Sequence, residues 1–160
     1  ERTFQLLTQV AGRSGRGREP GQVVVQAFHR DHYALETAAL QDYEAFYEKE
    51  IRFRRIMKYP PFVAIANIVV LAGSPESGVQ RARTVGEVFR AVGGDRLQVI
   101  GPTVAPVAKL KDRYRYQVLL KSDSKRRLSD ALNHAVMELT TRGISSARDL
   151  VIDMDPVTLM

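Results

Sequence analysis

The stretch Val63-Ala-Ile-Ala-Asn-Ile-Val-Val-Leu-Ala72 is followed at once by Gly73-Ser74-Pro75-Glu76. The first ten residues are dense in isoleucine and valine, a composition that favours a β-strand. Serine is a common residue at helix N-caps, and proline is well tolerated at the first helical position. These signals together predict a strand over 63–72 and a helix that begins at Pro75.

The rest of the second half continues this alternation of strands and helices. Apolar residues recur at helical spacing after Pro75, and Gly93-Gly94 then ends that helix. The pattern further predicts strands over 97–100, 113–120 and 150–154, a loose segment over 104–108, and a helix over 124–142. The order β-α-β-β-α-β is that of an α+β ferredoxin-like unit, an antiparallel sheet with two helices on one face.

The first half of the chain has a different pattern. Apolar spacing predicts helices over 3–11, 32–40 and 43–57, and the β-branched run 22–28 predicts a short buried strand. Tyr59-Pro60-Pro61-Phe62 ends the third helix, because two prolines cannot continue an α-helical ladder. We therefore place a domain boundary here, which divides the chain into residues 1–58 and 59–160.

The composition excludes several classes of protein. The chain contains no cysteine, so it forms no disulfide and no thiolate zinc site. No apolar run approaches the roughly 18 residues of a membrane span, and no signal peptide is recognisable. We therefore expect a cytoplasmic protein without membrane contact. The sequence starts with Glu1 inside a helix-like segment, and we interpret it as the C-terminal part of a longer protein.

Positive charge is concentrated in one stretch of the chain. Residues 109–127 hold eight basic and two acidic side chains, a net charge of +6 that equals the net charge of all 160 residues. A focused positive field favours polyanions through counterion release. This distribution favours nucleic acid as a partner, with a solvated basic face as the alternative.

The run Gln9-Val-Ala-Gly-Arg-Ser-Gly-Arg-Gly17 places Arg13 and Arg16 three residues apart with glycine between them. A guanidinium is always charged, and its rigid fork of donors fits phosphate oxygens. An arginine held against the terminal phosphate of a nucleotide stabilises the charge that develops during phosphoryl transfer. The alternative interpretation is a surface turn that is rich in arginine and glycine.

This run resembles the last conserved motif of superfamily 2 helicases, and with its flanks it resembles the PriA family of primosomal replication-restart DNA helicases. Ser14 stands where alanine is more common in that motif. The Pro-Pro element after residue 58 resembles the one that follows the second helicase lobe of that family. Residues 112–117 resemble a Gly-Arg-Tyr-Arg-Trp/Tyr-Gln stretch, with Asp112 in place of glycine, and Asp153–Pro156 resemble the family's C-terminal end.

The resemblance implies a fold and an activity. Residues 1–58 would be the tail of the second RecA-like helicase lobe, and residues 59–160 the C-terminal domain. The intact protein would be an ATP-dependent 3′-to-5′ DNA helicase, an ATP hydrolase that recognises stalled or abandoned replication forks and restarts replication by primosome assembly. This chain has no phosphate-binding loop, Asp-Glu box or zinc cysteines. ATP, Mg²⁺ and zinc would therefore bind upstream, and the chain alone is predicted to be inactive.

The resemblance and the charge pattern also assign roles to residues. Arg13 and Arg16 are predicted to contact the β- and γ-phosphates of ATP as arginine fingers, and nucleotide binding is predicted for Gln9, Gly12 and Gly15. DNA binding is predicted for Lys109, Lys111, Arg113 and Arg115. Cations at a helix start oppose the macrodipole, which favours an anionic partner at Lys125 and Arg126. The family implies that this partner is the acidic tail of single-stranded DNA-binding protein.

Other candidates have structural interpretations. Tyr114 and Tyr116 share one strand face, either stacking on bases or joining the core, and we favour the core. His29 and His32 are too few to hold a metal, and we expect a structural role for them and for the carboxylate pair Asp153 and Asp155. No metal site is predicted in this chain.

Three rival functions stay open. The chain could be a stand-alone nucleic-acid-binding ferredoxin-like module, although Ile65–Leu71 lacks the stacking aromatic residues that RNA binding would need. It could come from a recombination-type superfamily 2 helicase, or from a catalytically inactive homologue that only loads other proteins. In the favoured interpretation its partners are forked DNA, single-stranded DNA-binding protein and other primosome proteins, and we expect a monomer.

Overall fold

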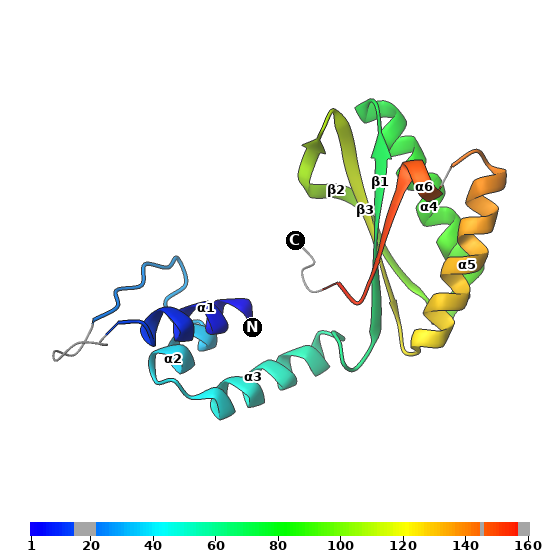
Figure 1. Ribbon diagram of the computed structural model, residues 1–160. Helices are drawn as coiled ribbons and strands as arrows, with labels where there is room; N and C mark the ends of the chain where they lie inside the picture. The colour runs from blue at the N-terminus through cyan, green and yellow to red at the C-terminus, as the bar shows by residue number, and fades with distance from the viewer. Residues whose placement is uncertain (15–21, 145, 157–160) are drawn as a thin grey trace. The chain divides into compact units, whose positions relative to one another are not determined.

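The computed structural model describes residues 1–14, 22–144 and 146–156, and the chain divides into two units, Glu1–Met57 and Lys58–Met160 (Figure 1). Each unit has its own cluster of buried apolar side chains. The sequence places a domain boundary after residue 58, at the Pro-Pro element. The assignment of the first unit to a helicase lobe stays a prediction.

The described part of the first unit contains α1 (Arg2–Ala11), α2 (Tyr33–Ala39) and α3 (Tyr43–Ile56). Two of these helices begin at side-chain caps. His32 Nδ1 accepts a hydrogen bond from the Ala34 N–H at 3.1 Å, and Asp42 Oδ1 accepts one from the Ala45 N–H at 2.9 Å. Each cap satisfies a backbone donor that the helix itself leaves unpaired, which explains where these helices start.

The core of the first unit is small. Phe4 of α1 stacks on Phe46 of α3 with 4.3 Å between ring centroids, and Ala34 and Ala38 of α2 complete the buried cluster. Leu7 and Tyr33 pack against it while partly exposed. The three helices therefore hold together through few apolar contacts.

The predicted buried strand over 22–28 is wrong for this chain. These residues have no regular secondary structure, and the side chains of Val24 and Phe28 are almost fully exposed. A strand needs a neighbour for its backbone N–H and C=O groups. The described residues of the first unit include no other strand that could supply one.

The second unit contains four strands, with helices between them, in its described residues. Their bounds are β1 (Ala64–Ala72), α4 (Pro75–Gly93), the 3₁₀ turn η1 (Gly94–Arg96), β2 (Gln98–Leu110), β3 (Arg113–Ser122), α5 (Lys125–Thr141), α6 (Ser146–Asp149) and β4 (Leu150–Met154). This order agrees with the predicted β-α-β-β-α-β pattern. Across the described part of the chain, no helix is both long and apolar enough to cross a membrane.

The four strands form one antiparallel sheet in the order β2-β3-β1-β4. The central strand β3 therefore lies between β1 and β2, the two strands that α4 connects. Helices α4 and α5 cover the same face of the sheet (Figure 1). The sequence predicts this arrangement, an antiparallel sheet with two helices on one face.

The core of the second unit lies between this sheet and the two long helices. Alternate residues of the central strands face the helices, among them Ile68 of β1 and Val118 and Leu120 of β3, all fully buried. Phe89 of α4 and Leu128 of α5 meet them with no exposed surface. Helix α4 starts at a capping box, in which the Ser74 and Ser77 side chains each bond the other's backbone N–H.

Strand β2 is longer than the sequence predicts. The segment 104–108, which we expected to be loose, continues the strand to Leu110. The register of its pairing with β3 shifts twice, once between Ile100 and Thr103 and once between Val104 and Lys109. Pro102 and Pro106 lack the N–H of a regular ladder, and an edge strand tolerates both.

Candidate functional site

The first candidate residue, Arg13, follows the C-terminus of α1 and is exposed. Its N–H donates to the Val10 carbonyl at 3.1 Å, and Ser14 Oγ donates to the Ala11 carbonyl at 3.0 Å. Local hydrogen bonds therefore set the backbone of this turn, while the guanidinium stays open to solvent. Gln9 is exposed one helical turn earlier on α1.

Gly12 is also exposed, at the C-cap of α1, with φ −68° and ψ −8°. Any L-residue adopts this conformation, so the local backbone does not require glycine here. That glycine is needed at position 12 to let a ligand approach the backbone closely stays a prediction. Gly15 and Arg16, the other predicted nucleotide-contacting residues, lie outside the described residues.

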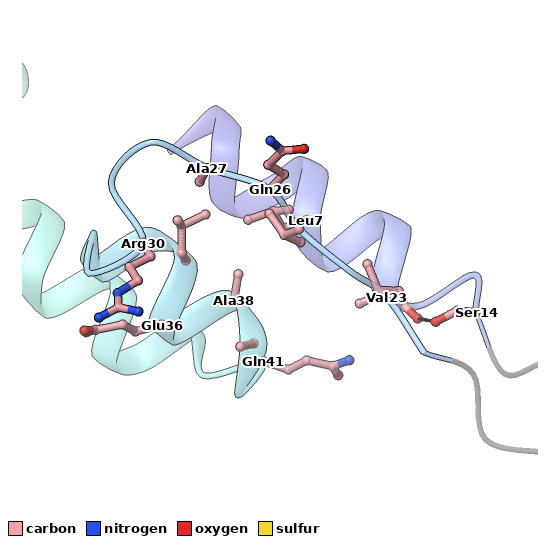
Figure 2. A pocket seen from close by; sticks show the side chains of 13 residues that line it. Leu7, Ser14, Val23, Gln26, Ala27, Arg30, Glu36, Ala38 and Gln41 are labelled. Carbon is pink, nitrogen blue, oxygen red and sulfur yellow. Dashed lines mark hydrogen bonds between the residues drawn. The ribbon is translucent and has the colours of Figure 1, made fainter.

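A groove of about 900 Å³ lies within the first unit, beside this turn. Its walls come from α1, the segment 23–30 and α2, and Ser14 of the turn lies at one end (Figure 2). Its lining is mixed, with apolar side chains such as Leu7, Val23 and Val25 beside polar ones such as Gln26 and Arg30. The segment expected to be a buried strand thus forms one wall of this groove.

The second candidate site is the basic hairpin, residues 109–115 at the β2–β3 turn. The two turn residues, Lys111 and Asp112, have φ of 48° and 59°, so both adopt the left-handed conformation of a type I′ turn. The ammonium of Lys109 lies 3.1 Å from Asp112 Oδ1 and 5.3 Å from the centre of the Tyr114 ring. Lys109 and Lys111 are exposed. The tight turn thus leaves both lysine side chains accessible to solvent.

The two arginines of the basic hairpin are half-buried, in contrast to its lysines. Arg113 Nη2 donates to the Leu71 carbonyl at 3.4 Å and lies 3.6 Å from Asp149 Oδ1. Arg115 lies opposite Leu71 in the pairing of β3 with β1. The sequence predicts DNA binding for all four cations alike. In the structure, Arg113 differs from the lysines because it contacts the carboxylate of Asp149.

The tyrosines of β3 belong to the core, as we favoured from the sequence. Tyr116 is buried, and its hydroxyl donates to the Pro75 carbonyl at 3.1 Å. Tyr114 packs partly exposed against the same core cluster. The residues of β1 and β3 that alternate with the core-facing ones include no aromatic side chain. The strand residues on this face therefore lack the base-stacking rings of the rival RNA-binding module.

A charged cluster around Asp149 was not predicted from the sequence. The Asp149 side chain is only 2% exposed, and its Oδ1 lies 2.7 Å from Arg81 Nη1 and 3.6 Å from both Arg113 Nη2 and Arg148 Nε. Arg81 comes from α4, Arg113 from β3 and Arg148 from α6. Arg148 is the sequence neighbour of Asp149, whereas Arg81 and Arg113 are far from it in the sequence and reach it only through the fold.

The N-terminus of α5 carries the predicted partner-binding cations. Ser124 Oγ caps the helix by accepting from the Arg127 N–H at 3.4 Å. Arg127 donates two hydrogen bonds to Asp123, and these lower the pKa of that carboxyl below its ordinary value. Lys125 pairs with Asp155 Oδ2 at 2.5 Å, and Arg126 is exposed. Two of these three cations therefore have acidic neighbours that offset their conflict with the helix dipole.

Two of the remaining candidates, His32 and Asp155, have polar partners in the structure. His32 caps α2, and Asp155 pairs with Lys125. Asp153 is exposed on β4, opposite Asn67 of β1. Within residues 1–14, 22–144 and 146–156, no group of three or more histidine or acidic residues could hold a metal ion.

A polar network in the first unit perturbs two pKa values. The Tyr33 hydroxyl donates to Glu50 Oε2 at 2.6 Å, and Arg54 Nε donates to Glu50 Oε1 at 2.7 Å. Burial and the Glu50 hydrogen bond raise the pKa of Tyr33 to about 12. Burial alone would raise the pKa of Glu50, but the hydrogen bonds from Tyr33 and Arg54 outweigh it and lower that pKa. The network therefore links α2 to α3 and favours a charged Glu50.

In the second unit, Lys121 lies against the Pro-Pro element. Its ammonium is 4.1 Å from the centre of the Tyr59 ring, a cation–π distance. Burial lowers the pKa of Lys121, and the nearby charge of Lys58 lowers it further.

The chain is similar in sequence to one protein family and to several known proteins. The family model described as the primosomal protein N C-terminal domain matches residues 55–157. A replication restart protein PriA of Bacillus subtilis is 37% identical over the whole chain, which covers 20% of that relative. Proteins of the same name from Chlamydia pneumoniae and Haemophilus influenzae are 36% and 34% identical, with 99% of this chain matched and 21% and 22% of theirs. The chain thus spans about a fifth of the length of these relatives.

Proposed function

Because this chain belongs to the PriA family, we propose that it serves a replication restart protein that is an ATP-dependent 3′-to-5′ DNA helicase. Such a protein recognises stalled or abandoned forks and restarts replication by assembling a primosome. The chain contributes a DNA-binding surface, arginine fingers and a protein-docking surface. The strongest support for this proposal is the exposure of the two lysines of the basic hairpin, Lys109 and Lys111.

The DNA-binding role belongs to the basic hairpin. Lys109 and Lys111 are exposed beside a two-residue turn, so duplex phosphates reach both ammonium groups without rearrangement of the sheet. Their charge favours any polyanion, because binding releases condensed counterions. The residues of β1 and β3 that face away from the core include no aromatic side chain, so phosphate contact rather than base stacking accounts for affinity.

The catalytic role belongs to the arginine motif. Arg13 is exposed at the end of α1, and with Arg16 it would contact the β- and γ-phosphates of ATP. Gln9 and the two glycines would line the same nucleotide site. The chain carries no phosphate-binding loop, so ATP, Mg²⁺ and zinc bind to other parts of the longer protein. This chain alone does not hydrolyse ATP.

The docking role belongs to the start of α5. Arg126 is exposed there, and Lys125 is paired with a single surface carboxylate. Exposed ion pairs contribute little to stability, so an acidic peptide exchanges readily with Asp155 at Lys125. The acidic tail of single-stranded DNA-binding protein is the proposed occupant.

The test of the DNA-binding role is the affinity of the 160-residue chain for forked DNA across a salt series. The variant Lys109→Gln/Lys111→Gln removes two charges from the basic hairpin. Its matched control, Arg52→Gln/Arg83→Gln, removes two exposed charges elsewhere. Each lost phosphate contact flattens the slope of log K against log[salt] by about 0.9. We expect the hairpin variant to weaken binding and flatten the slope by about 1.8, and the control to leave the slope unchanged.

Equal slopes for the two variants would overturn the DNA-binding role of the basic hairpin. In that case the docking role is measured separately, by binding of an acidic peptide to the chain and to Lys125→Gln/Arg126→Gln. A loss of peptide affinity in this variant alone supports docking at α5.

A further inference from the structure

Three arginines of the second unit converge on one buried carboxylate. Arg81, Arg113 and Arg148 all lie within 3.6 Å of the same oxygen, Asp149 Oδ1. We propose that these arginines form a phosphate cradle that holds one backbone phosphate of DNA. That the phosphate belongs to DNA rests on the proposed function, whereas the existence of a phosphate site is argued from the geometry of the cluster.

The charge of the cluster is unbalanced. One carboxylate neutralises one guanidinium, so these four side chains together carry a net charge of +2. Of the three arginines, Arg81 makes the shortest contact with Asp149, at 2.7 Å, and a structural ion pair needs no further cation. Like charges held close together repel each other, and an anion among them relieves this repulsion. The cluster is therefore suited to bind a second negative group.

Arg113 has an unused donor in the cluster. Its Nε is buried, and among the described residues it has no hydrogen-bond partner. Its Nη2 is also poorly used, because it lies 3.4 Å from the Leu71 carbonyl. Buried donors are usually satisfied, so an idle one calls for an acceptor. A phosphate offers several oxygens that match the planar fork of a guanidinium.

The phosphate cradle is accessible and adjoins the basic hairpin. The side chains of Arg81 and Arg113 are each 36% exposed, and that of Arg148 is 69% exposed. Arg113 is the first residue of β3, directly after the turn residues Lys111 and Asp112. A duplex that contacts the turn lysines therefore runs close to the three guanidinium groups. Buried Asp149 acts as the positioning residue that holds them together.

The test compares Arg148→Gln with Arg83→Gln in the 160-residue chain. Arg148 is the most exposed of the three arginines, so its substitution leaves the buried Arg81–Asp149 pair intact. Arg83 is an exposed arginine on the same helix as Arg81 and provides a matched loss of charge. Loss of one phosphate contact reduces the slope of log K against log[salt] for forked DNA by about 0.9.

We expect this smaller slope and a several-fold loss of affinity for Arg148→Gln, and neither for Arg83→Gln. Arg148→Lys, which keeps the charge, is expected to restore the slope. If Arg148→Gln and Arg83→Gln behave alike on DNA that the chain binds, the phosphate cradle is overturned.

A second measurement separates the cradle from the proposed function. If the chain binds no forked DNA, the proposed DNA-binding role fails, and inorganic phosphate becomes the probe. Phosphate, compared with sodium chloride at equal ionic strength, should then raise the unfolding temperature of the original chain and of Arg83→Gln but not of Arg148→Gln. Equal shifts in all three proteins, or no shift in any, would overturn the phosphate cradle.

Discussion

Among single residues, Asp112 is one of the two left-handed positions at the turn of the basic hairpin. Its φ of 59° is in the left-handed region, where the Cβ of an L-residue meets the following carbonyl. Glycine avoids this contact, and a type I′ turn favours glycine at its second central residue. We expect Asp112→Gly to raise the free energy of unfolding by about 0.5 kcal/mol, the strain relief less the entropy cost of glycine.

The control for this substitution is Asp112→Asn, because asparagine tolerates the same conformation and also removes the ion pair with Lys109. Urea unfolding of both variants separates the contribution of backbone strain to the free energy of unfolding from that of the ion pair. An asparagine variant as stable as the glycine variant would show that backbone strain contributes nothing at this turn.

At Tyr33, a single hydroxyl group affects the pKa of Glu50. Its hydroxyl donates to Glu50, so Tyr33→Phe removes a hydrogen bond that lowers the pKa of that carboxyl. We expect the pKa of Glu50, measured by NMR with labelled glutamate, to rise in this variant. Tyr47→Phe, which changes an exposed ring on α3, is the matched control and should leave this pKa unchanged.

The pH dependence of stability has a definite sign here. The folded-state pKa of Glu50 is lowered, so its stabilisation is present above the ordinary glutamate pKa of about 4.3 and is lost as the pH falls through the lowered value. The stability difference between the original chain and Tyr33→Phe should therefore shrink on acidification below about pH 4. A difference that stays constant from neutral to acid pH would contradict a charged role for Glu50.

At the scale of elements, Gly78 determines how closely α4 approaches β3. A Cβ built at this position would lie 2.2 Å from the ring of Tyr116, which is buried and bonded to Pro75. Alanine would gain about 1 kcal/mol of helix propensity but overpack the core, which typically costs about 1–3 kcal/mol. We expect Gly78→Ala to lower the free energy of unfolding of the second unit by about 1 kcal/mol.

The substitution Gly73→Ala is a suitable control for this packing argument. A Cβ at Gly73 meets no heavy atom within 4 Å, so its stability in urea should change little. If Gly78→Ala is as stable as this control, the ring of Tyr116 moves aside at little cost, and close packing of α4 on β3 is not required.

Across the whole chain, the two units differ greatly in how much apolar surface they bury. The second unit buries residues from four strands and two long helices, whereas the buried cluster in the described part of the first consists of two phenylalanines and two alanines. Regions with few buried contacts open locally at low free energy. We expect hydrogen exchange to protect amides of β1 and β3 for much longer than amides of α1, α2 and α3.

Two substitutions test whether the units are independent. Phe46→Ala removes a buried ring from the first unit, and Leu120→Ala removes a buried side chain from the second. Each should speed exchange in its own unit and leave the other unit unchanged. Loss of protection in β1 and β3 after Phe46→Ala would show instead that the units unfold together.

Much of the second unit could be predicted because its signals are local. Ser74 and Pro75 mark the start of α4, and the final strand over 150–154 has the predicted bounds. The first unit was harder to predict, because the β-branched run 22–28 has the propensity of a strand but no described neighbour to pair with. Propensity alone therefore misassigned this segment, since burial and pairing depend on residues distant in the sequence.

By itself, the sequence determined the order of the strands and long helices of the second unit, the basic hairpin and the family to which the chain belongs. These features depend on the type and spacing of neighbouring residues, which the order of residues fully specifies. Only the tertiary structure decided that β2 continues past its prolines, that Tyr116 lies in the core, and that Arg81, Arg113 and Arg148 meet at Asp149. The physical reason is that most of these contacts, such as that of Arg81 with Asp149, join residues far apart along the chain, and chain folding alone sets which of them become neighbours.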